Sequence, residues 1–138
     1  MEKFEVLDIS GDVGLRAFGG SKSEAFMNAA LGMYSLITNL DAVEEKKTID
    51  VSVESNLSDG LLVSWLNELI FHFDTYGFIG KNIVISRFSD NKMAATIKGE
   101  EFDPGRHDGK LLIKAATYHR LKIEKKGRIW EIEVIFDI

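Results

Sequence analysis

Hydrophobic and polar positions alternate along the first part of the chain. Phe4 and Val6 alternate with their neighbours, and residues 13–17 repeat the pattern after a glycine at position 11. Because successive side chains of a strand point to opposite faces, a period of two is typical of β-structure. The pattern predicts two short strands joined near Gly11.

Two later segments have the spacing of helices instead. Ser21 and Glu24 form the S-x-x-E pattern of a capping box, which predicts an amphipathic helix over about 22–38. Ser58 and Asp59 are expected to cap a second helix, which ends at Gly77. Its wide apolar stripe is typical of a core-facing helix and consists of Leu62, Trp65, Leu66, Leu69 and Phe73.

The remaining segments read as strands rich in β-branched and aromatic residues. They are expected at 49–54, 82–88, 93–98, 111–117, 119–124 and 129–136. The resulting order lacks regular βαβ alternation, so an α+β fold is favoured over a doubly wound one. We expect a mostly antiparallel β-sheet packed with two amphipathic α-helices, in a single domain covering residues 1–138.

The amino-acid composition excludes several classes of catalytic and metal site. The chain has no cysteine, which excludes thiolate catalysis, zinc ribbons, iron–sulfur clusters and disulfide frameworks. No apolar run reaches the roughly 20 residues that a membrane span needs. A cytoplasmic protein with no membrane partner is the expectation.

The charge balance bears on possible partners. The formal net charge is −5, and the only basic cluster flanks Gly127 in a predicted hairpin turn. Stand-alone nucleic-acid binding depends on clustered lysine and arginine that neutralise phosphates. Any link to RNA is therefore expected to be indirect, through a partner protein.

Carboxylates are the most evident candidate chemistry. Asp8 and Asp12 bracket the turn between the first two strands, where each could simply form the turn. Asp137 and the α-carboxylate of Ile138 close the last predicted strand. If the first and last strands pair, then Asp12, Asp137 and Ile138 form an all-oxygen site for calcium or magnesium.

A loop over residues 99–109 carries the only proline. Asp103-Pro104-Gly105 is a strong turn signal, whereas Arg106 and His107 are candidates for binding groups. The three histidines lack helical metal spacing, and neither a nucleophile elbow nor a phosphate-binding loop is present. The sequence offers carboxylates without an assembled active site.

Several segments together resemble the archease family, nearly end to end and in the family's order. They are residues 8–19, which begin Asp8-Ile9-Ser10-Gly11-Asp12, and residues 25–33, 62–69, 99–107, 113–119 and 134–138. Two departures are visible. The family motif usually reads Asp-His-Thr-Ala-Asp, so Ile9 stands where the family has histidine, and Glu101 replaces a small residue or proline before Phe-Asp-Pro.

The resemblance implies an accessory protein and not an enzyme. Archeases act with the RtcB-type RNA ligase, which uses GTP and manganese to join RNA ends in tRNA splicing and RNA repair. The resemblance therefore implies that this chain promotes guanylylation of the ligase histidine and supports multiple turnover. It implies that Asp12, Asp137 and Ile138 ligate a divalent cation. All-oxygen ligands in flexible number favour calcium, and magnesium or manganese also suits them. The ligase-activation candidates are Lys114, Asp8, Arg106, His107 and His119.

Two other functions remain open from the sequence. A metal-dependent hydrolase would need Asp8, Asp12, Asp103 and His107 to converge on one pocket with an open metal position. A chaperone-like binding module would need an extended exposed apolar patch.

Overall fold

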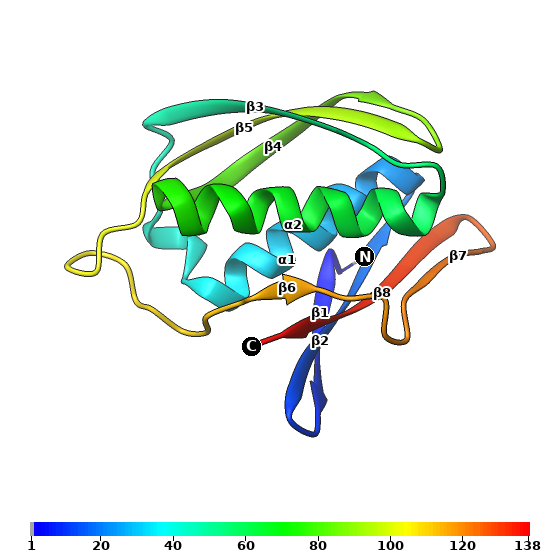
Figure 1. The fold of residues 1–138 in the computed structure, drawn as a ribbon, viewed down its shortest axis with the longest axis horizontal. Helices are drawn as coiled ribbons and strands as arrows, with labels where there is room; N and C mark the ends of the chain where they lie inside the picture. Colours follow the sequence, from blue (N-terminus) through cyan, green and yellow to red (C-terminus); the bar gives the residue numbers. More distant parts are fainter. Residues whose placement is uncertain (1) are drawn as a thin grey trace.

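Two helices lie between two antiparallel β-sheets in the computed structural model, which describes residues 2–138 (Figure 1). The first sheet has the order β1–β2–β8–β6, and β7 also pairs with β8. Its strands are β1 (Phe4–Ile9), β2 (Asp12–Gly19), β6 (Ala115–Ala116), β7 (Lys122–Lys126) and β8 (Ile129–Asp137). The second sheet has the order β3–β5–β4, with β3 (Lys47–Glu54), β4 (Phe78–Phe88) and β5 (Lys92–Glu101). The predicted α+β class is confirmed, and the division into two sheets is a further finding.

Helix α1 (Lys22–Ile37) begins as the capping box predicts. The Glu24 N–H donates to Ser21 Oγ at 3.1 Å. The Glu24 carboxylate accepts from the Gly20 N–H at 2.9 Å, one residue before the usual position. A Cβ at Gly19 would lie 2.4 Å from the Ala25 backbone nitrogen, so glycine allows β2 to run closely into the helix.

Helix α2 (Ser58–Tyr76) ends as predicted at Gly77, whose φ of 70° is left-handed. The predicted cap is wrong. Leu57 holds the N-cap position without a side-chain hydrogen bond, and Ser58 Oγ instead accepts from Lys22 Nζ at 2.6 Å. Ser58 therefore links the amino-terminal ends of α1 and α2 instead of capping its own helix.

The core lies around the two helices, which are covered by a sheet on each side. Trp65 of α2 is fully buried, and its Nε1 donates to the Phe26 carbonyl of α1 at 3.0 Å. Ile132, Val134 and Phe136 of β8 are fully buried, which confirms the predicted inward face of the last strand. Each such side chain contributes roughly 1.5–3 kcal/mol of hydrophobic stabilisation.

Residues 111–117 differ from the prediction. Only Ala115 and Ala116 form strand β6, because the preceding backbone bonds to the end of α1. The Lys110 N–H donates to the Ile37 carbonyl at 2.9 Å, and the Leu111 N–H to the Leu36 carbonyl at 3.1 Å. Leu111 and Ile113 pack against the core whereas Leu112 is exposed, and the segment satisfies helix-end carbonyls that would otherwise lack partners.

Residues 119–124 also differ, since β7 starts only at Lys122. Arg120 has a φ of 55°, and the Leu121 N–H donates to the Tyr118 carbonyl at 3.2 Å. A turn of this kind prevents a continuous strand. The β7–β8 hairpin around Gly127, with a φ of 65°, agrees with the prediction.

A short 3-10 turn, η1 (Leu40–Ala42), links α1 to β3. No helix within residues 2–138 combines the length and the apolar character needed to cross a membrane.

Candidate functional site

Two aspartates lie at the end of the first sheet where strand β2 begins and strand β8 ends. Val13 lies opposite Phe136 at the end of the β2–β8 ladder, and the next residues beyond this pair are Asp12 and Asp137. Directly opposed residues of antiparallel strands carry their side chains on the same face, with Cβ atoms about 4.5–5.5 Å apart. The pairing of β2, not β1, with the last strand is what brings these carboxylates together.

The β1–β2 turn fixes this arrangement. Ile9 lies opposite Asp12, so only Ser10 and Gly11 connect the strands. Gly11 has a φ of 81°, which a residue with a side chain rarely adopts. A Cβ at Gly14 would come within 2.9 Å of Ile9 Cδ1, so Ile9 packs over Gly14 beside the aspartate. The residue at the family's histidine position is therefore a packing residue in this chain.

Three more predicted residues adjoin the aspartates. The Lys114 N–H donates to the Asp137 carbonyl at 2.8 Å, and the Lys114 side chain is exposed. Ile138 follows Asp137 and is 42% exposed. Asp8 lies opposite Val13, so its side chain leaves the sheet on the other face from Asp12. We call Asp12, Asp137, Lys114 and Ile138 the carboxylate edge.

A neighbouring row of charges on the same face of the sheet is already balanced. Glu5, Arg16 and Glu133 lie opposite one another on β1, β2 and β8. Arg16 donates to Glu133 at 2.9 Å and to Glu5 at 2.6 Å, and these hydrogen bonds raise the pKa of the guanidinium. Glu133 is only 3% exposed and also lies 3.6 Å from Arg120. The charges of the row pair with one another across three strands.

The carboxylate edge lacks such balance. Within the part of the chain that the structure describes, neither Asp12 nor Asp137 has a side-chain hydrogen bond or an ion pair. Two unpaired carboxylates on adjacent strands repel each other, and oxygen donors of this kind suit a hard cation. The residues present therefore fit calcium or magnesium better than a soft metal.

The end of β5 and the loop that follows it hold a second, separate group of polar residues. Glu100 is 3% exposed and accepts from the Glu44 N–H at 2.6 Å and from Arg106. His107 is also buried, and its Nδ1 accepts from the Asp103 N–H at 2.8 Å. Its ring proton then lies on Nε2, which is 3.1 Å from Glu100 and donates to it.

Burial by itself raises the pKa of the Glu100 carboxyl. Hydrogen bonds from the Glu44 N–H, Arg106 and His107 outweigh burial and lower the pKa to about 2. Glu100 is therefore a carboxylate at neutral pH that holds the loop in place. Both nitrogens of His107 have partners, Asp103 in the loop and Glu100 in β5, which makes this histidine a structural residue.

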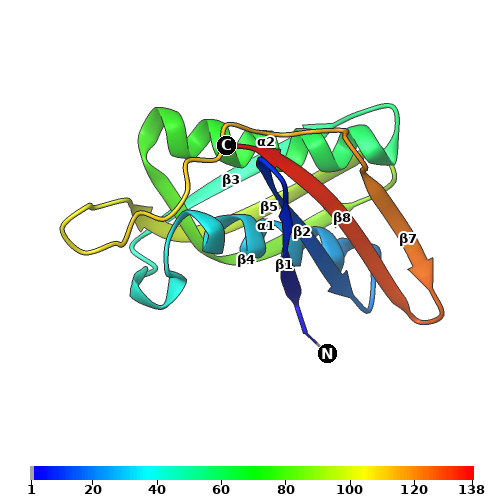
Figure 2. The ribbon, with the colours of Figure 1, turned by 90° about the horizontal axis from the view of Figure 1, so that it is seen from below.

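The candidates for ligase activation thus separate into three places. Asp8 and Lys114 lie at or beside the carboxylate edge, Arg106 and His107 lie on the loop after β5, and His119 is exposed in the turn before β7. The loop and the β1–β2 hairpin project from different parts of the molecule (Figures 1 and 2). Residues 2–138 contain no group of three or more histidine, aspartate or glutamate side chains placed to hold a metal. The four residues of the hydrolase hypothesis therefore do not converge.

Exposed apolar side chains are distributed over several elements. They are Val6, Leu57, Phe71, Tyr76, Val84, Leu112, Tyr118 and Ile138. Among them, the rings of Phe71 and Tyr76 lie together on α2, with centroids 6.2 Å apart. The chaperone hypothesis called for a patch extended over the surface, and this pair of rings is small by comparison.

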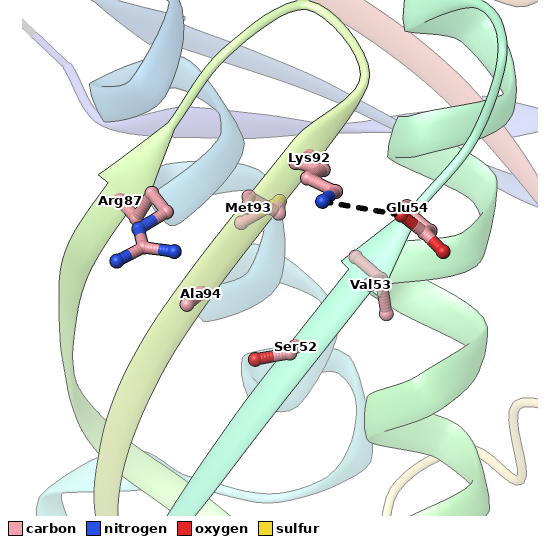
Figure 3. A pocket seen from close by; sticks show the side chains of 7 residues that line it. All are labelled: Ser52, Val53, Glu54, Arg87, Lys92, Met93 and Ala94. Carbon is pink, nitrogen blue, oxygen red and sulfur yellow. Dashed lines mark ion pairs between the residues drawn. The ribbon is translucent and has the colours of Figure 1, made fainter.

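The outer face of the second sheet carries a shallow cavity of about 320 Å³ (Figure 3). Ser52 and Ala94 form its floor, Arg87 lies on one side, and Lys92 pairs with Glu54 at 3.7 Å on the other. None of the predicted site residues lines this cavity, so it is separate from the carboxylate edge.

Sequence reasoning missed the buried polar residues. Glu100 and Glu133 were not recognised, although Arg16 in an otherwise apolar strand signals a buried ionic partner. Glu100 had no comparable signal, because its partners come from the distant Glu44 and from the loop.

Comparison with known proteins agrees with the fold and with the sequence resemblance. Residues 4–138 match the model of the family described as "Archease protein family (MTH1598/TM1083)". The chain is 36% identical over 143 residues to protein archease of Pyrococcus furiosus and 32% identical over 139 residues to that of Sulfurisphaera tokodaii, with complete coverage of both chains in each case.

Two solved structures share the fold. The solution structure of Methanobacterium thermoautotrophicum protein 1598 has a TM-score of 0.79 and 31% identity, with full coverage of both chains. The crystal structure from Thermotoga maritima, described as "an archease, possible chaperone", has a TM-score of 0.68 and 19% identity, covering 96% of this chain and 94% of that one. The family match over residues 4–138 and these full-length relatives show that the chain belongs to the archease family.

Proposed function

We propose that this protein is an accessory factor that activates an RtcB-type RNA ligase. In this role it promotes GTP-dependent guanylylation of the ligase histidine and supports multiple turnover, and it meets RNA only through the ligase. Membership of the archease family and the convergence of Asp12, Asp137 and Lys114 at one edge support this role. The net charge of −5 is consistent with a partner that is a protein.

A divalent cation at the carboxylate edge belongs to the proposal. Asp12, Asp137 and the α-carboxylate of Ile138 would hold it, with calcium favoured and magnesium or manganese also suited to the oxygen donors. A bound cation removes the repulsion between the aspartates and orders the hairpin against β8. Calcium takes about six to eight oxygen ligands, so positions remain for water or for a group of the ligase.

Lys114 supplies the second half of the proposed contact. Its amine is exposed, and its backbone is fixed to Asp137. Three carboxylates, a divalent cation and the lysine carry charges that cancel, so cation binding would remove the net negative charge of this edge and leave the Lys114 amine exposed. Such an edge suits a ligase surface that carries the phosphates of GTP.

Guanylylation of a purified RtcB-type ligase tests the proposal. We expect wild-type protein to stimulate guanylylation and turnover, and Asp12→Asn, Asp137→Asn and Lys114→Met to lose that stimulation. Asp74→Asn and Lys98→Met change exposed residues elsewhere and serve as matched controls that keep stimulation. Wild-type stimulation by all three edge variants, or no stimulation by the wild-type protein, would show the proposal to be wrong.

A further inference from the structure

The free edge of the second sheet lies beside α2. β3 is the edge strand of the order β3–β5–β4, and β5 is its only strand partner within residues 2–138. Helix α2 packs next to β3 in both views (Figures 1 and 2). The unpaired side of an edge strand presents backbone N–H and C=O groups that a further strand can bind.

Two cavities line up between this edge and the helix. One, of about 450 Å³, lies between Val53 of β3 and Val63 and Phe71 of α2. The other, of about 310 Å³, lies between Ile49 of β3 and Tyr76 of α2. Ile49 and Val53 are four residues apart, which is about 13 Å along a strand. We call this surface, formed by the linings of the two cavities, the β3–α2 groove.

The exposed apolar part of the groove is aromatic. Phe71 is 51% exposed and Tyr76 is 62% exposed, and the His72 ring lies beside both, with centroids 5.7 and 5.8 Å away. Large rings that remain open to solvent together are characteristic of binding surfaces, because they bury much area with few rotatable bonds. A strand added to β3 would direct alternate side chains toward these rings.

Charge distinguishes between occupants. Glu54 and Glu68 both line the first cavity, with side chains 73% and 39% exposed. Lys92 lies 3.7 Å from Glu54, but exposed pairs of this kind are weak and leave the carboxylates available to another cation. In a symmetric pairing of β3 with a second copy, two exposed Asp50 side chains would lie opposite each other in the register centred on Asp50, whereas a basic segment meets no such repulsion.

We propose that the β3–α2 groove binds an extended segment of another protein as an added strand. Apolar side chains four residues apart enter the two cavities, and a lysine or arginine of the segment pairs with Glu54 and Glu68. The groove belongs to the second sheet and the carboxylate edge to the first, so this interaction does not depend on the ligase-activating role.

A synthetic peptide tests the groove directly. The probe has about nine residues, alternates threonine with apolar residues, places phenylalanine and leucine four positions apart and carries a lysine at each end. It is titrated into isotope-labelled full-length protein up to about 1 mM while amide shifts are recorded. We expect saturable shifts confined to β3, α2 and their neighbours.

Matched variants define the mode of binding. Replacing both Phe71 and Tyr76 with alanine should weaken binding at least about tenfold, because exposed aromatic residues dominate such interfaces. Both residues are exposed, so thermal unfolding should remain close to wild type. Val84→Ala removes an exposed apolar side chain from β4, and Asp12→Asn alters the carboxylate edge, and both should bind the peptide normally. N-methylation of one alternate set of peptide amides should abolish binding, and methylation of the other set should not.

Several results would overturn the proposal. These are the absence of shifts at the highest peptide concentration, unchanged affinity in the Phe71 and Tyr76 variant, or equal effects of the two methylated peptides. Sedimentation of the free protein covers the remaining alternative. Dimerisation that the same double substitution abolishes would show that a second copy occupies the groove.

Discussion

Replacement of Glu100 tests how the loop after β5 is held. Glu100→Gln keeps the shape of the side chain but turns one of its two oxygens into an NH₂ group. Both oxygens accept hydrogen bonds, one from Arg106 and the other from His107 and the Glu44 N–H. The glutamine amide has one accepting oxygen, so at least one of these buried donors is left without an acceptor.

The expected loss follows from the bonds involved. A hydrogen bond to a charged group contributes about 1.5–3 kcal/mol, so we expect Glu100→Gln to lower the free energy of unfolding by about 3 kcal/mol. For a chain of 138 residues this corresponds to a fall in Tm of roughly 10 °C. Glu101→Gln is the matched control, because Glu101 is 68% exposed and its ion pair with Lys47, at 3.7 Å, is open to solvent. The control should stay within about 0.5 kcal/mol of wild type.

The pH dependence gives an independent measurement. The folded pKa of Glu100, about 2, lies below its ordinary value of 4.5, so the folded state binds this proton less readily than the unfolded state. Its contribution to stability is therefore complete above about pH 4.5 and is lost as the pH falls toward 2. Urea unfolding across this range should show a smaller pH slope for Glu100→Gln than for wild type. Equal slopes, together with a stability change below about 0.5 kcal/mol, would refute the proposed network.

Three further predictions concern the carboxylate edge and the last strand. In EDTA, Asp12→Asn should raise the free energy of unfolding by up to about 1 kcal/mol, because carboxylates about 5 Å apart repel by that amount in water. With calcium at about 100 times its Kd, calorimetry should show that the free energy of unfolding of the wild type rises by about 2.7 kcal/mol and that of the variant by much less. Deleting residues 136–138 should lower Tm by at least about 10 °C in thermal unfolding, because Phe136 is fully buried and losing a buried phenylalanine costs about 3–5 kcal/mol. The purified protein alone should neither join nor hydrolyse RNA ends in a gel assay; activity that survives repurification and disappears on a point mutation would contradict the accessory role.

Local patterns in the sequence predicted most of the elements. The S-x-x-E spacing at Ser21 predicted the start of α1, and Gly77 the end of α2. Both signals depend on residues within a few positions of one another, so they can be read without the rest of the chain. The inward face of β8 was also predicted locally, although Glu133 and Ile135 of its other face are buried as well.

Predictions that needed a distant partner were less complete. The apolar residues of 111–117 predicted a strand, but this backbone bonds to the end of α1, so only Ala115 and Ala116 pair with β8. Ser58 had the right chemistry for a cap, yet its hydroxyl bonds to Lys22 of the other helix. In both cases the partner comes from a distant part of the chain, which the local pattern does not contain.

The site shows the same division. The carboxylates of the sequence suggested Asp12, Asp137 and Ile138 as one group, and the resemblance added Lys114. Their proximity was decided by the pairing of β2 with β8, a choice of neighbour among many strands that no local pattern contains. The Glu100 network and the β3–α2 groove likewise exist only in the folded chain. Periodicity determines which faces are apolar, whereas the burial of those faces against one another determines which polar groups meet.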